Sequence, residues 1–146
     1  GDYILVIDEG TTSTRAIVFD RDLNEVALAQ QEVPLSYPND GWVEQDGEEI
    51  WDKTVDVCRK AIAEAGGVDR IAGIGITNQR ETSEVWNKEP GKPVYSTIVW
   101  QCRRTADRCA ALAERGVDVL WPRSLGRDLT TSAVLDTKPR RGGTVV

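Results

Sequence analysis

Histidine and methionine are both absent from this 146-residue sequence, which also contains only one phenylalanine. Without histidine, a serine–histidine or cysteine–histidine nucleophile pair and any histidine metal ligand are excluded, so acid–base chemistry falls to carboxylates or lysine. No apolar run approaches the length that spans a bilayer, and no basic start precedes an apolar stretch of signal-peptide length. We therefore expect a cytoplasmic protein with no membrane span.

Cysteine is scarce as well. The three cysteines, Cys58, Cys102 and Cys109, are odd in number and show no Cys-x-x-Cys spacing. That pattern does not suit a disulfide framework or a zinc site. We expect three reduced thiols that act as small buried apolar side chains.

The sequence also lacks an excess of basic residues. It contains 18 Lys and Arg residues and 24 Asp and Glu residues, which gives a net charge of −6. The acidic side chains are spread along the chain, so the broad positive surface that binds a phosphate backbone is absent, and we expect no nucleic-acid partner. Hydrophobic residues at 40% and charged residues at 29% are typical of a globular domain. The length suffices for one core.

The first half of the chain alternates between short apolar runs and polar turns. Residues 3–8 and 15–20 are rich in branched apolar side chains and predict a β-hairpin, and residues 25–33 predict a third strand. Asp46 is a suitable N-cap for a helix whose apolar positions recur at helical spacing until Gly66. The opening therefore predicts three consecutive strands followed by a helix.

The second half predicts further strands and a second helix. Apolar and β-branched runs predict the strands, a Pro-Gly pair predicts a turn, and a helical run ends at a glycine. These segments are residues 71–77, 82–86 and 94–100 for the strands, 89–92 for the turn and 102–115 for the helix. The order is that of a mixed α/β fold, in which we expect the strand at 71–77 to be buried. Residues 117–146 show no sustained period, and we expect them to be poorly ordered.

A polar turn joins the first two strands. In the segment DEGTTSTR at residues 8–15, an acidic residue ends the first strand, Gly10 permits a tight turn and four hydroxyl side chains follow. Backbone N–H groups and hydroxyls in such a turn can donate to phosphate oxygens, Asp8 can hold hydrated Mg²⁺ and Arg15 can neutralise charge. These groups suit phosphoryl transfer, although the same composition is equally typical of an ordinary hairpin turn.

Charged side chains follow the predicted strand at 71–77. Arg80 can donate to the hydroxyls of a small polyol and Glu81 can accept from them, at a strand end where ligand sites of α/β sheets tend to lie. From these two residues alone, a surface charge pair is the better-supported interpretation. Further along, Trp100 can form an apolar wall beside a carbon skeleton or serve as a structural residue that ends a strand.

Several segments taken together resemble one known family. Residues 8–20 resemble the opening of the FGGY carbohydrate kinases, in particular of the glycerol kinases among them, and four further segments agree with these in order and spacing. The segments are DEGTTSTRAIVFD (8–20), GWVEQD (41–46), EIW (49–51), GITNQRET (75–82) and IVWQCRRTA (98–106). The resemblance covers the chain from Tyr3 to about Gly116.

The resemblance implies a fold and a reaction. The fold is an incomplete ribonuclease-H-like lobe of the actin and hexokinase type over residues 1–116, followed by a divergent segment at 117–146. The ligands are MgATP and glycerol, and the reaction gives glycerol 3-phosphate and ADP. A kinase for another polyol and a non-catalytic binding protein stay open as alternatives, and so does a homo-oligomer of the longer protein.

Site residues also follow from the resemblance, position by position. Phosphate contacts are implied for Thr11, Thr12, Ser13 and Arg15, a place on the magnesium side for Asp8, and glycerol contacts for Arg80, Glu81 and Trp100. Trp100 would lie against the carbon chain of glycerol. No catalytic residue can be assigned, because the family's catalytic base lies beyond the matched part.

The sequence departs from the family in two respects. Glu9 stands where glutamine is usual, which places an extra carboxylate near the phosphate turn. The catalytic base and the adenosine pocket are missing from the match, so we expect the chain alone to be nearly inactive, since alignment and exclusion of water supply most of the catalysis in this chemistry. A change of reading frame soon after Gly116 is one hypothesis for the short match.

Overall fold

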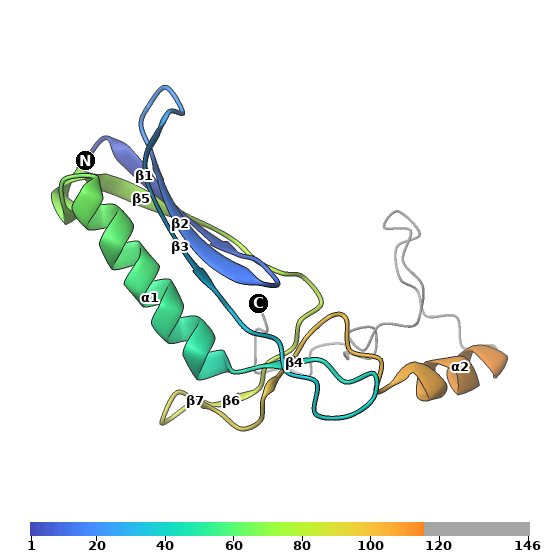
Figure 1. Ribbon diagram of the computed structural model, residues 1–146. Helices are drawn as coiled ribbons and strands as arrows, with labels where there is room; N and C mark the ends of the chain where they lie inside the picture. The colour runs from blue at the N-terminus through green and yellow to red at the C-terminus, as the bar shows by residue number, and fades with distance from the viewer. Residues whose placement is uncertain (116–146) are drawn as a thin grey trace.

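The computed structural model describes residues 1–115, which form a four-stranded sheet with one long helix on one face and a smaller part built from short strands (Figure 1). The sheet strands are β1 (Tyr3–Glu9), β2 (Ser13–Phe19), β3 (Glu25–Glu32) and β5 (Ile71–Thr77), in the order β3-β2-β1-β5. β2 pairs antiparallel with β1 and with β3, whereas β5 is parallel to β1. The predicted hairpin, third strand and mixed α/β arrangement are confirmed.

The helix α1 (Gly47–Glu64) begins and ends where its sequence predicts. The Asp46 carboxylate accepts from the backbone N–H of Glu48 at 2.9 Å and of Glu49 at 3.3 Å, which satisfies two donors that have no partner within the helix. At the other end, Gly67 has a φ of 107° and its N–H donates to the carbonyl of Ile62 at 2.9 Å. A short 3₁₀ turn, η1 (Val68–Arg70), then leads directly into β5.

The main core lies between α1 and the sheet. Alternate residues of the first three strands point toward the helix, and small residues on α1 let it lie close to them. The buried set is Leu5, Ala16, Val18 and Ala27 from the strands with Val57, Ala61 and Ala65 at the helix. α1 packs on β2 and β3, makes a smaller contact with β1 and contacts the fourth strand least, although Ile71 at the start of that strand packs against this core.

The strand β5 is therefore not buried, contrary to the prediction for residues 71–77. Ile74 lies opposite Leu5 and Ile76 opposite Ile7, so both isoleucines are on the face of the sheet that α1 covers elsewhere. Their side chains are nevertheless 63% and 72% exposed. The physical reason is that, within residues 1–115, β5 is an edge strand and the helix on this face lies mainly over the other half of the sheet.

The remaining elements are short. They are β4 (Glu44–Gln45), paired with β8 (Thr97–Ile98), the hairpin of β6 (Trp86–Asn87) and β7 (Lys92–Pro93), and the helix α2 (Ala106–Glu114). A second buried cluster of Val43, Val99 and Cys102 lies in this part. Both sheets here have two strands only, and Figure 1 shows α2 projecting away from the rest of the fold.

Three predicted boundaries in this part are wrong. The strands expected at 82–86 and 94–100 shrink to β6 and β8, with a single bridge between Ser83 and Ile98, while the Pro-Gly turn falls between β6 and β7 as expected. The helix expected from residue 102 begins at Ala106. The Cys102 N–H closes a local turn on the carbonyl of Val99, and the Arg103 N–H donates to the carbonyl of Gly41, a tertiary bond that fixes the backbone ahead of the helix.

All three cysteines are free thiols, as predicted. Cys102 and Cys109 are buried as expected, whereas Cys58 is only half-buried. Burial raises the pKa of the Cys58 thiol, and the charge of Glu9 raises it further. The prediction of poor order for 117–146 lies outside the described residues, as does Gly116. Within residues 1–115, no helix is both long and apolar enough to cross a membrane.

Candidate functional site

The turn between β1 and β2 is held from three directions. The Gly10 N–H donates to the Ser13 carbonyl at 2.9 Å, the Val33 N–H to the Thr12 carbonyl at 2.8 Å, and Gln45 Nε2 to the Thr11 carbonyl at 2.6 Å. Each of these bonds uses a carbonyl of the turn, and none uses the N–H group of Thr11 or Thr12. A turn fixed in this way can direct N–H and hydroxyl donors toward an anion.

The predicted phosphate residues lie at the surface of this turn. Thr12 is exposed, and Thr11 and Ser13 are half-buried. An open hollow of about 550 Å³ lies beside them, and its lining residues are Thr12, Ser13, Gln30, Glu32, Val33, Pro34 and Lys53. Lys53 donates to the Glu32 carbonyl at 2.7 Å and pairs with Glu49 at 2.7 Å, so the hollow has a fixed ammonium group in its wall.

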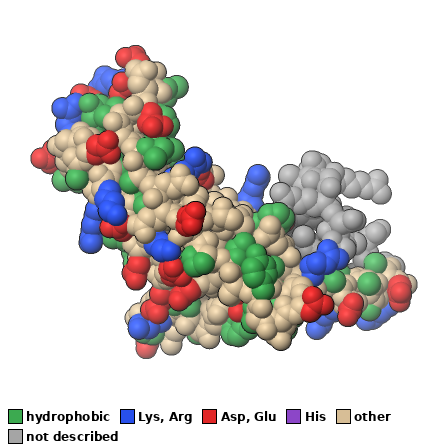
Figure 2. Space-filling model, viewed as in Figure 1, with side chains coloured by type: hydrophobic (Ala, Val, Ile, Leu, Met, Phe, Trp, Pro, Cys, Tyr) green, Lys and Arg blue, Asp and Glu red, His purple; other side chains and the backbone are tan. Residues whose placement is uncertain are grey.

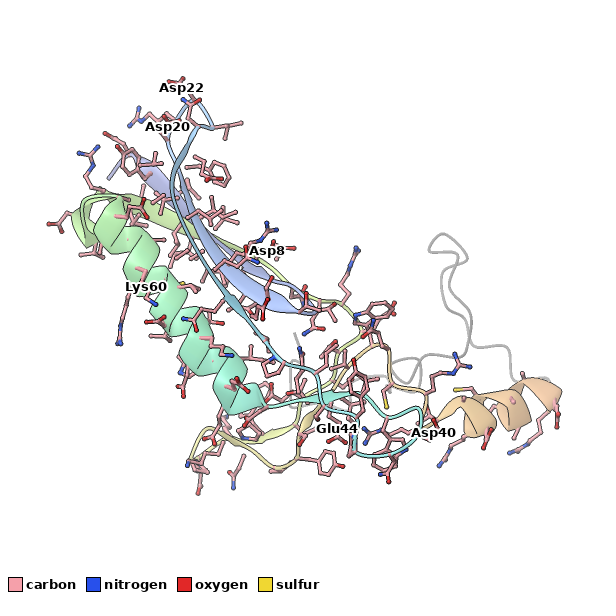
Figure 3. All side chains as sticks on the ribbon, in the orientation of Figure 1. Asp8, Asp20, Asp22, Asp40, Glu44 and Lys60 are labelled. Carbon is pink, nitrogen blue, oxygen red and sulfur yellow. The ribbon has the colours of Figure 1, made fainter. Side chains whose placement is uncertain are left out.

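Asp8 and Arg15 form an ion pair on the opposite face of the sheet from α1 (Figure 3). They are direct cross-strand neighbours, and Arg15 Nε donates to Asp8 Oδ2 at 3.1 Å while the Nη2 group contacts the same oxygen. Oδ1 of Asp8 takes no bond from Arg15. Residues 1–115 contain no group of three or more Cys, Asp or Glu side chains able to hold a metal, so Asp8 is a single carboxylate here.

Glu9 lies on the other face. Its Oε1 accepts from the hydroxyls of Thr14 at 2.7 Å and of Thr54 on α1 at 2.6 Å. Thr14 is fully buried, so this bond satisfies a hydroxyl that water cannot reach. The extra carboxylate that the sequence places near the turn is thus used to join β1 and β2 to the helix, on the side away from Asp8.

The predicted polyol residues are partly brought to the turn. The Trp100 indole Nε1 donates to Thr11 Oγ1 at 3.0 Å, although 89 positions separate the two residues. Arg80 is exposed and takes no part in that bond, and Glu81 adopts a left-handed φ of 64°, which is uncommon for a residue other than glycine. Such backbone outliers cluster at ligand sites.

Sequence reasoning assigned no role to Gln45, Gln79 or Thr82. Gln79 Nε2 donates to Gln45 Oε1 at 2.8 Å, and the Thr82 hydroxyl donates to Gln79 Oε1 at 3.1 Å. All three lie inside the segments that carry the family resemblance, which was the only signal that could have pointed to them. Uncharged side chains like these show their function only through the partners that the fold supplies.

The face of the molecule drawn in Figure 2 carries charges of both signs. Figure 2 shows Lys and Arg side chains interspersed with Asp and Glu, with no broad region of one sign on the face in view. A small anion would therefore be bound by local donors such as those of the turn, rather than by a field extending over the surface.

Residues 3–125 match the model of the FGGY family of carbohydrate kinases, N-terminal domain. The chain belongs to this family. Solved structures of FGGY kinases confirm the predicted ribonuclease-H-like fold class. The chain superposes on Plasmodium falciparum glycerol kinase, solved with ADP, with a TM-score of 0.71 and 31% identity over 77% of this chain. A xylulose kinase from Rhodospirillum rubrum superposes with a TM-score of 0.72 at 30% identity over 80% of it.

Curated glycerol kinases match the chain at higher identity than the two solved structures above. The chain is 56% identical to the glycerol kinase of Vibrio campbellii over 117 residues, which are 80% of this chain and 23% of that protein. The two structures above are likewise covered over 23% and 24% of their length. The chain thus spans about a quarter of the length of the relatives it matches, and the described part is an incomplete lobe.

Proposed function

We propose that the chain supplies the phosphate turn and part of the alcohol site of an ATP-dependent glycerol kinase. The reaction transfers the γ-phosphoryl group of ATP to a primary hydroxyl of glycerol. A bond forms between the hydroxyl oxygen and the γ-phosphorus, the bond to the β-phosphate oxygen breaks and its electrons leave with ADP, and the hydroxyl proton passes to a general base supplied by the rest of the enzyme. The observation that carries the proposal is the bond between Trp100 and Thr11, which makes the two predicted subsites adjoin.

The turn would bind the phosphates. Thr11, Thr12 and Ser13 offer hydroxyl donors, and the N–H groups of the first two are not used by the bonds that hold the turn. Arg15 and Asp8 lie on the face of the β1–β2 pair opposite α1. There Arg15 would contact phosphate and Asp8 would lie on the magnesium side. Magnesium would arrive with the nucleotide, where it neutralises phosphate charge. A single carboxylate such as Asp8 suits a metal-bound water better than the metal itself, because Mg²⁺ usually keeps several waters.

Glycerol would lie beside Trp100. An indole face covers a carbon chain well, and Arg80 and Glu81 supply one donor group and one acceptor group for its hydroxyls. The 56% identity to the glycerol kinase of Vibrio campbellii over 117 residues supports glycerol as the substrate.

The chain alone should turn over very little. No base is assigned among residues 1–115, and a single lobe cannot enclose the reacting groups or exclude water. We expect purified, mass-verified chain to give almost no glycerol-dependent ADP. A robust signal would show that these residues suffice and would overturn this part of the proposal.

A hybrid tests the proposed activity directly. Residues 1–115 would replace the corresponding part of Vibrio campbellii glycerol kinase, to which they are similar enough to pack. We expect turnover on the order of 1–100 per second with glycerol, the usual range for kinases. D-xylulose would serve as the competing substrate. A folded hybrid that phosphorylates xylulose in preference to glycerol would contradict the substrate assignment, and one inactive with both would contradict the kinase assignment.

A further inference from the structure

Five hydrogen bonds form a closed ring that joins the phosphate turn to Trp100. The Trp100 indole donates to Thr11 Oγ1 at 3.0 Å, and its backbone N–H donates to Thr82 Oγ1 at 3.3 Å. The Thr82 hydroxyl donates to Gln79 Oε1 at 3.1 Å and Gln79 Nε2 to Gln45 Oε1 at 2.8 Å. Gln45 Nε2 donates to the Thr11 carbonyl at 2.6 Å. The ring therefore begins and ends at Thr11.

The members of the ring come from four separate segments. Thr11 is in the turn after β1, Gln45 is in β4, Gln79 and Thr82 follow β5, and Trp100 follows β8. The main sheet and the smaller part of the fold meet at these residues. A ligand that shifts one segment must therefore displace the others or break a bond.

Burial makes the ring costly to open. Gln45 is only 2% exposed, and its amide uses both its oxygen and its nitrogen in the ring. If either bond opened, a buried polar group would lose its partner where water cannot replace it. The two amides are thus held in a single orientation, with donors and acceptors in a fixed sequence.

The ring also decides what the Thr11 hydroxyl can do. An indole nitrogen is a donor only, so Thr11 Oγ1 must be the acceptor of the bond from Trp100. The hydroxyl hydrogen of Thr11 is then available for an external acceptor such as a phosphate oxygen. Donation from the indole strengthens that hydrogen as a donor, since bonds in a chain polarise one another.

We propose that Gln45 and Gln79 are positioning residues that couple phosphate binding at the turn to polyol binding beside Trp100. They act by holding the indole N–H on Thr11 and the turn on β4. The inference rests on the proposed function, because it requires both ligands. It predicts that each ligand binds more tightly when the other is present, with the same factor in both directions.

The test uses the 146-residue chain and the substitution Gln79→Glu. This change keeps the oxygen that accepts from Thr82 but places a second oxygen against Gln45 Oε1, which breaks the ring with almost no change in size. Gln101→Glu is the matched control, since Gln101 is exposed, adjoins Trp100 and receives the same charge. The probes are magnesium pyrophosphate and glycerol. Indole N–H signals in NMR spectra report the binding, and Trp100→Phe identifies the signal among the five tryptophans.

In the wild-type chain we expect saturating glycerol to lower the Kd for magnesium pyrophosphate by at least about fivefold, the lower end of the range for linked sites. In Gln79→Glu, glycerol should no longer change the Kd for magnesium pyrophosphate, and hydrogen exchange at the Trp100 indole should be faster. Gln101→Glu should leave both the effect of glycerol and the exchange rate as they are in the wild-type chain. Unchanged exchange in Gln79→Glu would overturn the inference, and so would faster exchange with the coupling intact. A wild-type chain that binds neither probe would contradict the proposed function of the chain, and the exchange comparison would still decide whether the ring holds Trp100.

Discussion

Arg104 donates to the buried carboxylate of Glu44 across 2.7 Å, and the same guanidinium lies over the ring of Trp42, 3.9 Å from its centroid. The Tyr95 hydroxyl donates to the same Glu44 oxygen at 2.9 Å. Glu44, marked in Figure 3, precedes Gln45 in β4. This ion pair therefore anchors the strand that carries one member of the hydrogen-bond ring.

Breaking this pair should destabilise the fold strongly. Only 12% of the Arg104 side chain and 7% of the Glu44 side chain are exposed. We expect Arg104→Met to lower the free energy of unfolding by about 3 kcal/mol, because it leaves a buried carboxylate without its partner. Urea denaturation measures the loss. The double variant Glu44→Gln with Arg104→Met should recover part of it, and a double variant less stable than Arg104→Met would contradict this account.

The same cluster predicts a loss of stability in acid. Burial by itself would raise the pKa of Glu44, but the hydrogen bonds from Arg104 and Tyr95 outweigh it and bring the pKa below the ordinary value of 4.5. The unfolded chain then binds a proton more readily than the folded one, so the stabilisation is present above pH 4.5 and is lost as pH falls through the lower folded pKa. Unfolding free energies measured across this range should fall less steeply in Glu44→Gln. Equal slopes in the two proteins would show that another group controls the acid response.

Glu84 should have the opposite effect. Burial raises its pKa above the ordinary value of 4.5 and outweighs a hydrogen bond with Thr97 that lowers it, and the charge of nearby Asp46 raises the pKa further. The folded state therefore disfavours the ionised carboxylate, and stability increases as pH falls through the raised pKa. Glu84→Gln should raise the urea midpoint at pH 7, where the wild-type side chain is charged. A lower midpoint would mean that the carboxylate makes a bond worth more than its burial costs.

Replacing Glu9 should affect stability more than ligand binding. Glu9→Gln keeps an oxygen that can accept from Thr14 and Thr54 but loses the charge, so we expect a cost of about 1 kcal/mol in unfolding free energy. The Kd for magnesium pyrophosphate should change by less than about twofold, which corresponds to ~0.4 kcal/mol. Titration calorimetry on both proteins checks this. A tenfold gain in affinity would instead show that the Glu9 charge reaches the phosphate turn.

The open edge of β5 should make the chain associate with itself. Ile74 and Ile76 are exposed on a seven-residue strand that has no charge and no proline, and such edges pair readily with other strands. Ile76→Lys should reduce dye binding and shift the size distribution toward monomer in light scattering. Leu23→Lys is the control, because Leu23 is 80% exposed but lies in the hairpin turn between β2 and β3. Equal effects of the two changes would argue against the edge as the site of association.

Local sequence signals predicted the main elements well where they were strong. Asp46 and the two glycines at the end of α1 marked the helix correctly because caps act through bonds to near neighbours. The second helix begins at Ala106 rather than at Cys102, after a segment in which the Arg103 N–H donates to the distant carbonyl of Gly41, a bond that no local pattern reveals.

By itself, the sequence determined the strands of the hairpin, the long helix, the free thiols and the polar turn between β1 and β2, since periodicity, capping and turn chemistry depend on neighbours in the chain. Only the tertiary structure decided that Glu9 faces the helix while Asp8 faces Arg15, and that β5 lies exposed at an edge. It also decided that Gln45 and Gln79 link Thr11 to Trp100. A hydrogen bond between residues far apart in the chain exists only once folding has brought donor and acceptor together, so its partners cannot be inferred from either segment alone.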